Sequence, residues 1–132
     1  MALKDLSVPI FAVGAEADHI APWRSVHKIA LFAGAETTFV LSGGGHNSAI
    51  VSPPGKPRAY YRVHAVGSCA EFIDPDEWLP KAPKKQGSWW PEWVRWLDEH
   101  SGPAQDAPSR FGAPEQGLKP LCDAPGSYVL RR

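Results

Sequence analysis

Two short apolar runs near the start of the chain constrain its fold more than any other feature. The first run, Ser7–Val13, is followed by Gly14 and then by Asp18. The second, Thr37–Leu41, is followed shortly by three glycines and His46. A short apolar run that stops at glycine is typical of a buried β-strand. The sequence therefore predicts two strands, each with a residue capable of acid–base chemistry just beyond its carboxyl end.

A helix is expected between these two strands. Pro22 suits its first turn, and Gly34 is a natural stop. Apolar residues recur at helical spacing within this segment, at Val26, Ile29, Ala30 and Ala33. A strand–helix–strand order predicts that the two strands are parallel neighbours in one sheet.

The second half of the chain shows weaker patterns. A short strand is expected at Tyr60–Val66, and a capped helical turn at Asp74–Leu79. A Trp-rich helix is expected over Ser88–Leu97. Beyond Gly102 the chain is rich in proline and glycine and lacks periodicity, until 126–130 hints at an ordered end.

These patterns predict an α/β fold over residues 1–102, followed by an irregular Pro/Gly-rich tail over residues 103–132. Two parallel strands with two helices leave both sheet edges uncovered, whereas parallel strands normally lie in sheets covered on both faces. The expected fold is therefore the last parallel strands of a larger sheet, with one crossover helix and the Trp-rich helix. The chain needs more sheet than it encodes.

Composition excludes several classes of function. The 14 basic and 14 acidic residues give zero net charge, which offers no electrostatic footprint for nucleic acid. No apolar run approaches the roughly 20 residues of a membrane span. The first residues lack the features of a signal peptide, and the two cysteines lack metal-type spacing. We therefore expect a cytoplasmic protein with free thiols.

Asp18 and His46 are the candidate catalytic residues. At the carboxyl ends of neighbouring strands, the carboxylate of Asp18 would accept the ring N–H of His46 and stabilise its protonated form. His46 would then act as a general base, and the glycines before it would let the backbone bend sharply. The alternatives are that Asp18 caps the helix near Pro22, and that His46 is a loop residue with one backbone hydrogen bond.

The other histidines suggest weaker hypotheses. No HxxxH or HxH spacing supports a metal site, so this alternative is disfavoured. Its ligands would be Asp18, His19, His46 and His64. His27 and His100 are expected at the surface or at helix ends.

Neither cysteine fits the role of a nucleophile. Cys69 follows Gly67 with one residue between them, as in a nucleophile elbow, but Glu71 stands where the elbow needs a second glycine. Cys69 would also follow the histidine in chain order, whereas the nucleophile precedes it in the α/β-hydrolase order. Cys122 lies in the tail, without strand or helix context.

The tryptophan cluster allows three interpretations. Packing anchors of an amphipathic helix are favoured for Trp89, Trp93 and Trp96, each with an N–H to satisfy. A hydrophobic patch for a polymer or an apolar particle surface is the second interpretation. Stacking on nucleic acid is the weakest, because only Arg95 supplies charge among these residues.

Several segments together resemble the C-terminal region of class I-type polyhydroxyalkanoate (poly-3-hydroxybutyrate) synthases, members of the α/β-hydrolase superfamily. The Gly-Ser-Trp-Trp-Pro block is the most particular to this family. The matching segments are Gly14–Trp23, Gly44–Asn47, Val51–Gly55, Gly87–Trp93 and Pro120–Val129. They follow the family order and extend over nearly the whole chain.

The resemblance implies an acyltransferase that uses Cys, Asp and His to polymerise 3-hydroxyacyl groups from coenzyme A thioesters, with release of coenzyme A. By this resemblance Asp18 is the triad acid and His46 the general base. It also implies no metal or organic cofactor, a homodimer in the full enzyme, and a cytoplasmic location at the surface of polymer granules.

One departure from the family limits this expectation. The Gly-x-Cys-x-Gly elbow is absent from the sequence, so an upstream synthase portion or a partner subunit would have to carry the nucleophile. By itself the chain is expected to be inactive. The alternatives are a truncated, non-catalytic protein that associates with granules or subunits, and a fragment of another α/β-hydrolase such as a depolymerase or a thioesterase.

Overall fold

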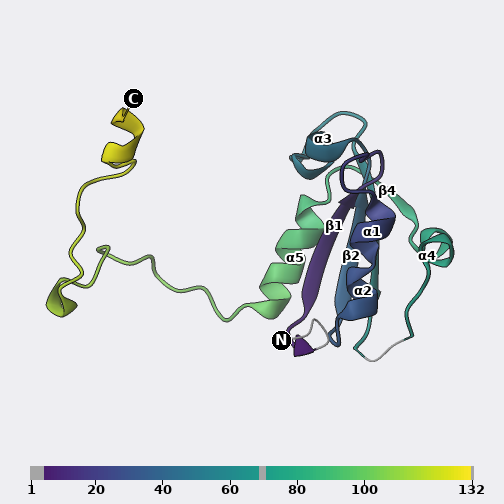
Figure 1. The fold of residues 1–132 in the computed structure, drawn as a ribbon, viewed down its shortest axis with the longest axis horizontal. Helices are drawn as coiled ribbons and strands as arrows, with labels where there is room; N and C mark the ends of the chain where they lie inside the picture. Colours follow the sequence, from purple (N-terminus) through teal and green to yellow (C-terminus); the bar gives the residue numbers. More distant parts are fainter. Residues whose placement is uncertain (1–4, 69–70, 132) are drawn as a thin grey trace. The chain divides into compact units, whose positions relative to one another are not determined.

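The computed structural model describes residues 5–68 and 71–131, and the chain divides into two compact units, Met1–Ser101 and Gly102–Arg132. The described residues of the first unit form a mixed α/β structure around a four-stranded sheet, with strand order β1-β2-β3-β4 (Figure 1). Because the candidate site lies in the first unit, the arrangement of this sheet decides where its residues meet.

Strands β1, Ile10–Ala15, and β2, Thr37–Ser42, pair in parallel, as the strand–helix–strand order predicts. Strand β3, Tyr60–Val66, has the predicted bounds and runs antiparallel to β2. Strand β4, Lys84–Gln86, then pairs antiparallel with β3. The sheet is therefore larger than the sequence pattern indicated, because β3 covers the edge of β2 that we expected to be open. Within the described residues, no strand pairs with the other edge of β1.

The helix expected between the first two strands consists of two short helices, α1, Trp23–His27, and α2, Ile29–Phe32. They meet at a tightened turn, in which the Lys28 N–H bonds to the Ser25 carbonyl three residues back. Helix α4, Pro75–Lys81, follows β3 and begins at the Asp74 cap, whose side chain accepts the Asp76 N–H.

Two further helices flank the candidate site. Helix α5, Trp90–His100, is the expected Trp-rich helix. Helix α3, His46–Ile50, was not predicted, because its five residues include asparagine and serine and directly follow three glycines.

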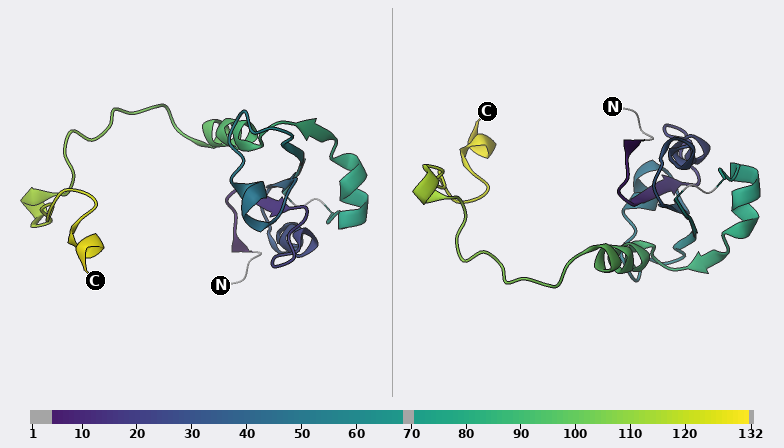
Figure 2. Two further views of the ribbon diagram at one scale, coloured as in Figure 1. Left: turned by 90° about the horizontal axis from the view of Figure 1, so that it is seen from above. Right: turned by 90° about the horizontal axis from the view of Figure 1, so that it is seen from below.

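Helices cover both faces of the sheet, and Figure 2 shows α5 on the opposite face from α1 and α2. On the α1 face, Phe39 and Leu41 pack with Trp78. On the α5 face, Val40 packs with Tyr61 and Trp89. Successive residues of β2 point to opposite faces and are buried on both, which explains why its central residues, 39–41, are all apolar.

His27 lies at the end of α1, as one of our expectations had it, but it is buried in the core, at 1% exposed. Aromatic rings surround it, with centroids 4.9 Å away for Phe39 and 5.5 Å away for Phe72 and Trp78. Within residues 5–68 and 71–131, neither ring nitrogen of His27 has a hydrogen-bond partner. Burial lowers the pKa of His27, and Asp74 partly opposes this effect.

The tryptophans of the α5 region differ in their surroundings. Trp89 is buried, and the Trp96 ring packs against Phe11 with centroids 5.6 Å apart. Trp93 is 42% exposed and contacts the ring of Trp89. The packing interpretation therefore holds for Trp89 and Trp96 and only in part for Trp93.

The second unit contains short 3₁₀ turns at Pro114–Gln116 and Ser127–Leu130, the latter within the segment where an ordered end was expected. Its apolar side chains are largely exposed, among them Phe111 and Leu121. Cys122 is an exposed free thiol in this unit, whereas Cys69 lies outside the described residues. No helix within the described ranges is long and apolar enough to cross a membrane.

Candidate functional site

Asp18 is held in the turn that follows β1 by bonds to its own neighbours. One carboxylate oxygen, Oδ1, accepts the backbone N–H of Ile20 at 2.9 Å and that of Ala21 at 3.0 Å. The side chain is only 6% exposed. Asp18 therefore organises the turn before α1 without capping that helix, because the N-cap of α1 is Pro22 and the helix has no side-chain cap hydrogen bond. The second oxygen of Asp18, Oδ2, is left to bond another partner.

Two of the three glycines before His46 are required by the structure, each for a different reason. A Cβ on Gly43 would lie 2.4 Å from the Tyr60 ring, so no other residue fits there without displacing that ring. Gly44 has a φ of +118°, which side-chain-bearing residues rarely adopt. The run leads the chain directly into α3, whose first residue is His46.

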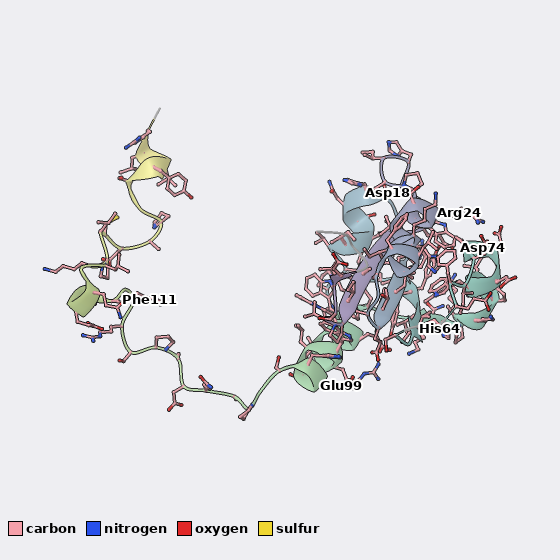
Figure 3. The ribbon with its side chains drawn as sticks, turned by 60° about the horizontal axis from the view of Figure 1, so that its bottom comes forward. Asp18, Arg24, His64, Asp74, Glu99 and Phe111 are labelled. Atoms are coloured by element: carbon pink, nitrogen blue, oxygen red, sulfur yellow. The ribbon has the colours of Figure 1, made fainter. Side chains whose placement is uncertain are left out.

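Backbone hydrogen bonds join the two segments that carry Asp18 and His46. The Glu16 N–H donates to the Ser42 carbonyl at 2.9 Å, and the Ala17 N–H donates to the Gly44 carbonyl at 3.0 Å. Since β1 and β2 are parallel, their carboxyl ends lie at the same end of the sheet. The two backbone bonds continue the pairing of the chains beyond the strands. Figure 3 shows Asp18 at this end of the first unit, with His64 and Glu99 toward the other end.

His46 and Asp18 are in direct contact. The distance between His46 Nδ1 and Asp18 Oδ2 is 2.7 Å. An ionised carboxylate only accepts hydrogen bonds, so Nδ1 carries the proton and donates it to Asp18. The bond leaves Nε2 as the nitrogen that can take up a proton, on a side chain that is 46% exposed.

The pKa of Asp18 is lowered to about 2, chiefly by the hydrogen bond from the Ala21 N–H, with further contributions from His46 and the Ile20 N–H. Asp18 is therefore ionised at neutral pH and accepts the imidazole N–H as a carboxylate. An ionised acid that orients an imidazole is an arrangement suited to general base catalysis by histidine.

The remaining histidines occupy other positions in the fold, and among them His19 adjoins Asp18 in the chain. His19 is exposed next to Asp18, and His64 belongs to β3. His100, at the end of α5, makes a 2.7 Å contact between Nδ1 and the Trp96 carbonyl oxygen. No group of three or more potential ligands capable of holding a metal ion occurs in the described part of the chain.

Sequence reasoning missed two residues that support the His46 segment. The buried Ser42 hydroxyl donates to the Ala49 carbonyl at 2.8 Å. The Lys56 ammonium donates to the Val51 carbonyl at 3.0 Å and also to the Ser48 carbonyl. A serine directly before the glycine run was a signal for the first, whereas nothing in the Pro/Gly-rich turn around Lys56 indicated the second.

Comparisons with known proteins give a consistent result. Poly(3-hydroxyalkanoate) polymerase 2 of Ectopseudomonas oleovorans is 40% identical over 130 residues, which cover 98% of this chain and 22% of that protein. The poly(3-hydroxyalkanoate) polymerase of Methylorubrum extorquens is 38% identical over 128 residues, covering 96% of this chain and 20% of that protein. The polymerase subunit of Rhizobium etli is 36% identical over 132 residues, covering 100% and 20% respectively.

The chain thus spans about a fifth of the length of the curated relatives it matches. No family model matches it. These relatives confirm the resemblance to polyhydroxyalkanoate synthases that the sequence motifs indicated.

Proposed function

The chain is homologous to the C-terminal part of the poly(3-hydroxyalkanoate) polymerases, and we propose that it supplies the acid and the base of a catalytic triad in such an enzyme. The observation that carries this proposal is the 2.7 Å contact between His46 Nδ1 and Asp18 Oδ2 at the carboxyl end of two parallel strands. The fold proposed for the whole enzyme is an α/β-hydrolase, in which the triad acid and histidine follow the nucleophile in this order.

The proposed first step is acyl transfer from a 3-hydroxyacyl-CoA to a cysteine outside this sequence. The thiol proton passes to His46 Nε2, the thiolate attacks the acyl carbonyl, and the bond between that carbon and the coenzyme A sulfur breaks. His46 returns the proton to the departing thiolate, so that coenzyme A leaves as a thiol. Asp18 stabilises the protonated imidazole in between.

Chain growth would use the same proton path. A 3-hydroxyl group gives its proton to His46, and its oxygen attacks the carbonyl of the acyl-cysteine. An ester bond forms, the carbon–sulfur bond breaks, and the cysteine thiolate regains its proton from His46. No metal or organic cofactor is needed for either step.

The nucleophile is proposed to come from another portion of the enzyme or from a partner subunit. The sequence contains no Gly-x-Cys-x-Gly or Gly-x-Ser-x-Gly elbow. A thiolate suits the role because it exchanges one thioester for another.

A chimera tests the proposal. This chain would replace the matching 22% of poly(3-hydroxyalkanoate) polymerase 2 of Ectopseudomonas oleovorans, and coenzyme A release from 3-hydroxyacyl-CoA would be measured with a thiol reagent. We expect an active chimera that loses activity by about 10³-fold or more in His46→Ala, because triad residues act as a unit. His19→Ala is the matched control, since His19 is exposed and is expected to leave the rate unchanged. Equal rates for His46→Ala and the unsubstituted chimera would refute the role of His46.

A second candidate function is a non-catalytic association with a granule or a subunit. The exposed apolar side chains of the second unit, Phe111, Leu121 and Leu130, favour it. Binding to polymer granules that is retained by Asp18→Ala and His46→Ala, together with a chimera that shows no catalysis, would support this candidate over the first.

A further inference from the structure

Helix α3, which begins with His46, is too short to hold its own position. Its backbone bonds include Ala49 N–H to the Gly45 carbonyl and Val51 N–H to the Asn47 carbonyl, at 3.0 and 2.9 Å. A helix of this length is unstable in isolation, and the last carbonyls of any helix lack partners within it. The position of His46 therefore depends on the groups that bond the carbonyls at the end of α3, which include the Ser42 hydroxyl and the Lys56 ammonium described above.

Two indole N–H groups from far along the chain reach these carbonyls. Trp89 Nε1 donates to the Ala49 carbonyl at 3.0 Å, and Trp90 Nε1 donates to the Ile50 carbonyl at 3.1 Å. Each pair is separated by 40 positions in the sequence. Figure 1 shows α3 beside the start of α5, where these two tryptophans lie.

Ser88 adds a third bond and joins the two segments more firmly. Its hydroxyl donates to the carbonyl of Ser52, just beyond α3, and accepts the Trp90 N–H at 3.0 Å. Ser88 and Ser52 are both buried. Three successive residues, Ser88–Trp90, thus bond the carbonyls at positions 49, 50 and 52.

The start of α5 is bonded to the sheet. Glu92, in the first turn of α5, is 8% exposed and accepts the Tyr61 hydroxyl at 2.9 Å and the Lys85 ammonium at 2.6 Å. Burial and the neighbouring Glu92 raise the pKa of Tyr61 to about 12, so its hydroxyl remains a donor over the ordinary pH range. The start of α5 therefore offers a rigid support for α3.

We propose that Trp89 and Trp90 are positioning residues for His46, holding α3 by their indole N–H groups so that the imidazole meets Asp18. This inference rests on the proposed function, in which His46 is the general base. A ring alone would not serve, because a phenylalanine would fill space without donating to a carbonyl. Trp78 and Trp96 show the contrast, since their buried N–H groups have no partner within the described residues.

The test reads the tautomer of His46 directly. In neutral imidazole one nitrogen carries the proton, and the bond to Asp18 selects the Nδ1–H form. Two-bond ¹H–¹⁵N spectra of the 132-residue chain with labelled histidine, taken at about pH 8.5, above the ordinary pKa of a free histidine, distinguish the two forms. We expect the unsubstituted chain to show the Nδ1–H form of His46, and Trp90→Phe to lose it in favour of Nε2–H.

Trp93→Phe is the matched control, because it also removes an indole from α5. The Trp93 side chain contacts the Trp89 ring and is 42% exposed. This substitution should leave the tautomer unchanged. Ser88→Ala, which removes a single oxygen, keeps the test decisive if a tryptophan variant fails to fold by circular dichroism, and it should also lose the Nδ1–H form.

An unchanged Nδ1–H form in folded Trp90→Phe and Ser88→Ala would overturn the positioning role, whatever the chimera does. A changed tautomer in both, with the Trp93→Phe spectrum unaltered, would establish it. Because the spectrum needs no nucleophile or substrate, failure of the proposed catalysis would appear only in the chimera assay, and the two failures remain distinct.

Discussion

The two halves of the candidate pair are held in contrasting ways. Asp18 is fixed by backbone N–H groups two and three residues away, within a single turn. His46 begins a short helix whose terminal carbonyls are bonded by Trp89 and Trp90, 40 positions later. One half of the site is therefore local and the other is a product of tertiary structure.

This difference teaches where the site is sensitive to change. The carboxylate of Asp18 has its backbone donors within a few consecutive residues, although the preceding Glu16 and Ala17 N–H groups also bond the segment that follows β2. The His46 segment depends on the glycine run, on β3 and on α5 together. Substitutions far from the pair should therefore displace the imidazole more readily than the carboxylate.

The largest expected effect on the difference between the two halves of the pair is a loss of activity when Asp18 is substituted. In the chimera, Asp18→Asn should lower the rate of coenzyme A release by about 10²- to 10⁴-fold, because an amide no longer stabilises the protonated imidazole and favours the wrong tautomer. The loss should not exceed that of His46→Ala. A near-normal rate for Asp18→Asn would show that His46 does not depend on its locally held partner.

The glycine run offers a structural test of the His46 side. Gly43→Ala should lower the free energy of unfolding by about 1–3 kcal/mol, because the new Cβ would lie 2.4 Å from the Tyr60 ring. Urea unfolding of the 132-residue chain measures this. The matched control is Gly45→Ala, whose Cβ would lie 3.9 Å from the nearest atom, the Ala17 carbonyl oxygen, and which should cost no more than about 1 kcal/mol. Equal costs would contradict the steric account of the run.

The buried His27, at the end of α1, should make the free energy of unfolding depend on pH. Its pKa is lowered in the folded state, so the unfolded state binds more protons near pH 6.5 and below. The contribution of neutral His27 to the free energy of unfolding should be fully present above the unfolded pKa. It should be lost as pH drops from 7 toward 5, by at most about 1.4 kcal/mol per pH unit. His27→Phe should flatten this slope in urea unfolding series. An unchanged slope would mean that another group carries the acid sensitivity.

The smallest expected effect tests whether the Asp18 turn is truly local. In His46→Ala the pKa of Asp18 should rise from about 2 and still remain below 3.8, because its largest cause is the Ala21 N–H and not the imidazole. A ¹³C titration of the carboxyl carbon measures it. A return to the ordinary value would show that His46, rather than the backbone, holds the carboxylate.

Sequence reasoning succeeded where the determinants are close together in the chain. Apolar runs ended by glycine predicted β1 and β2, and their parallel pairing brought Asp18 and His46 together. The β-branched and aromatic run Tyr60–Val66 predicted β3 with its observed bounds.

Other features could not be predicted because distant residues decide them. The exposed residues of β4, Lys84–Gln86, carry no apolar alternation, and only their pairing with β3 makes them a strand. The helix α3 has poor intrinsic propensity and exists through its tertiary bonds. The Trp-Trp pair was evident as a family motif, but no pattern revealed which carbonyls its N–H groups would reach.

The 40-position separation between α3 and its indole donors also orders the events of folding. Closing so long a loop costs entropy that is recovered only after β3, α4 and β4 have brought Trp89 and Trp90 alongside. The turn around Asp18 can form as soon as its few residues leave the ribosome. On the proposed role of Trp89 and Trp90, the imidazole–carboxylate pair is completed only after residues beyond 90 are synthesised.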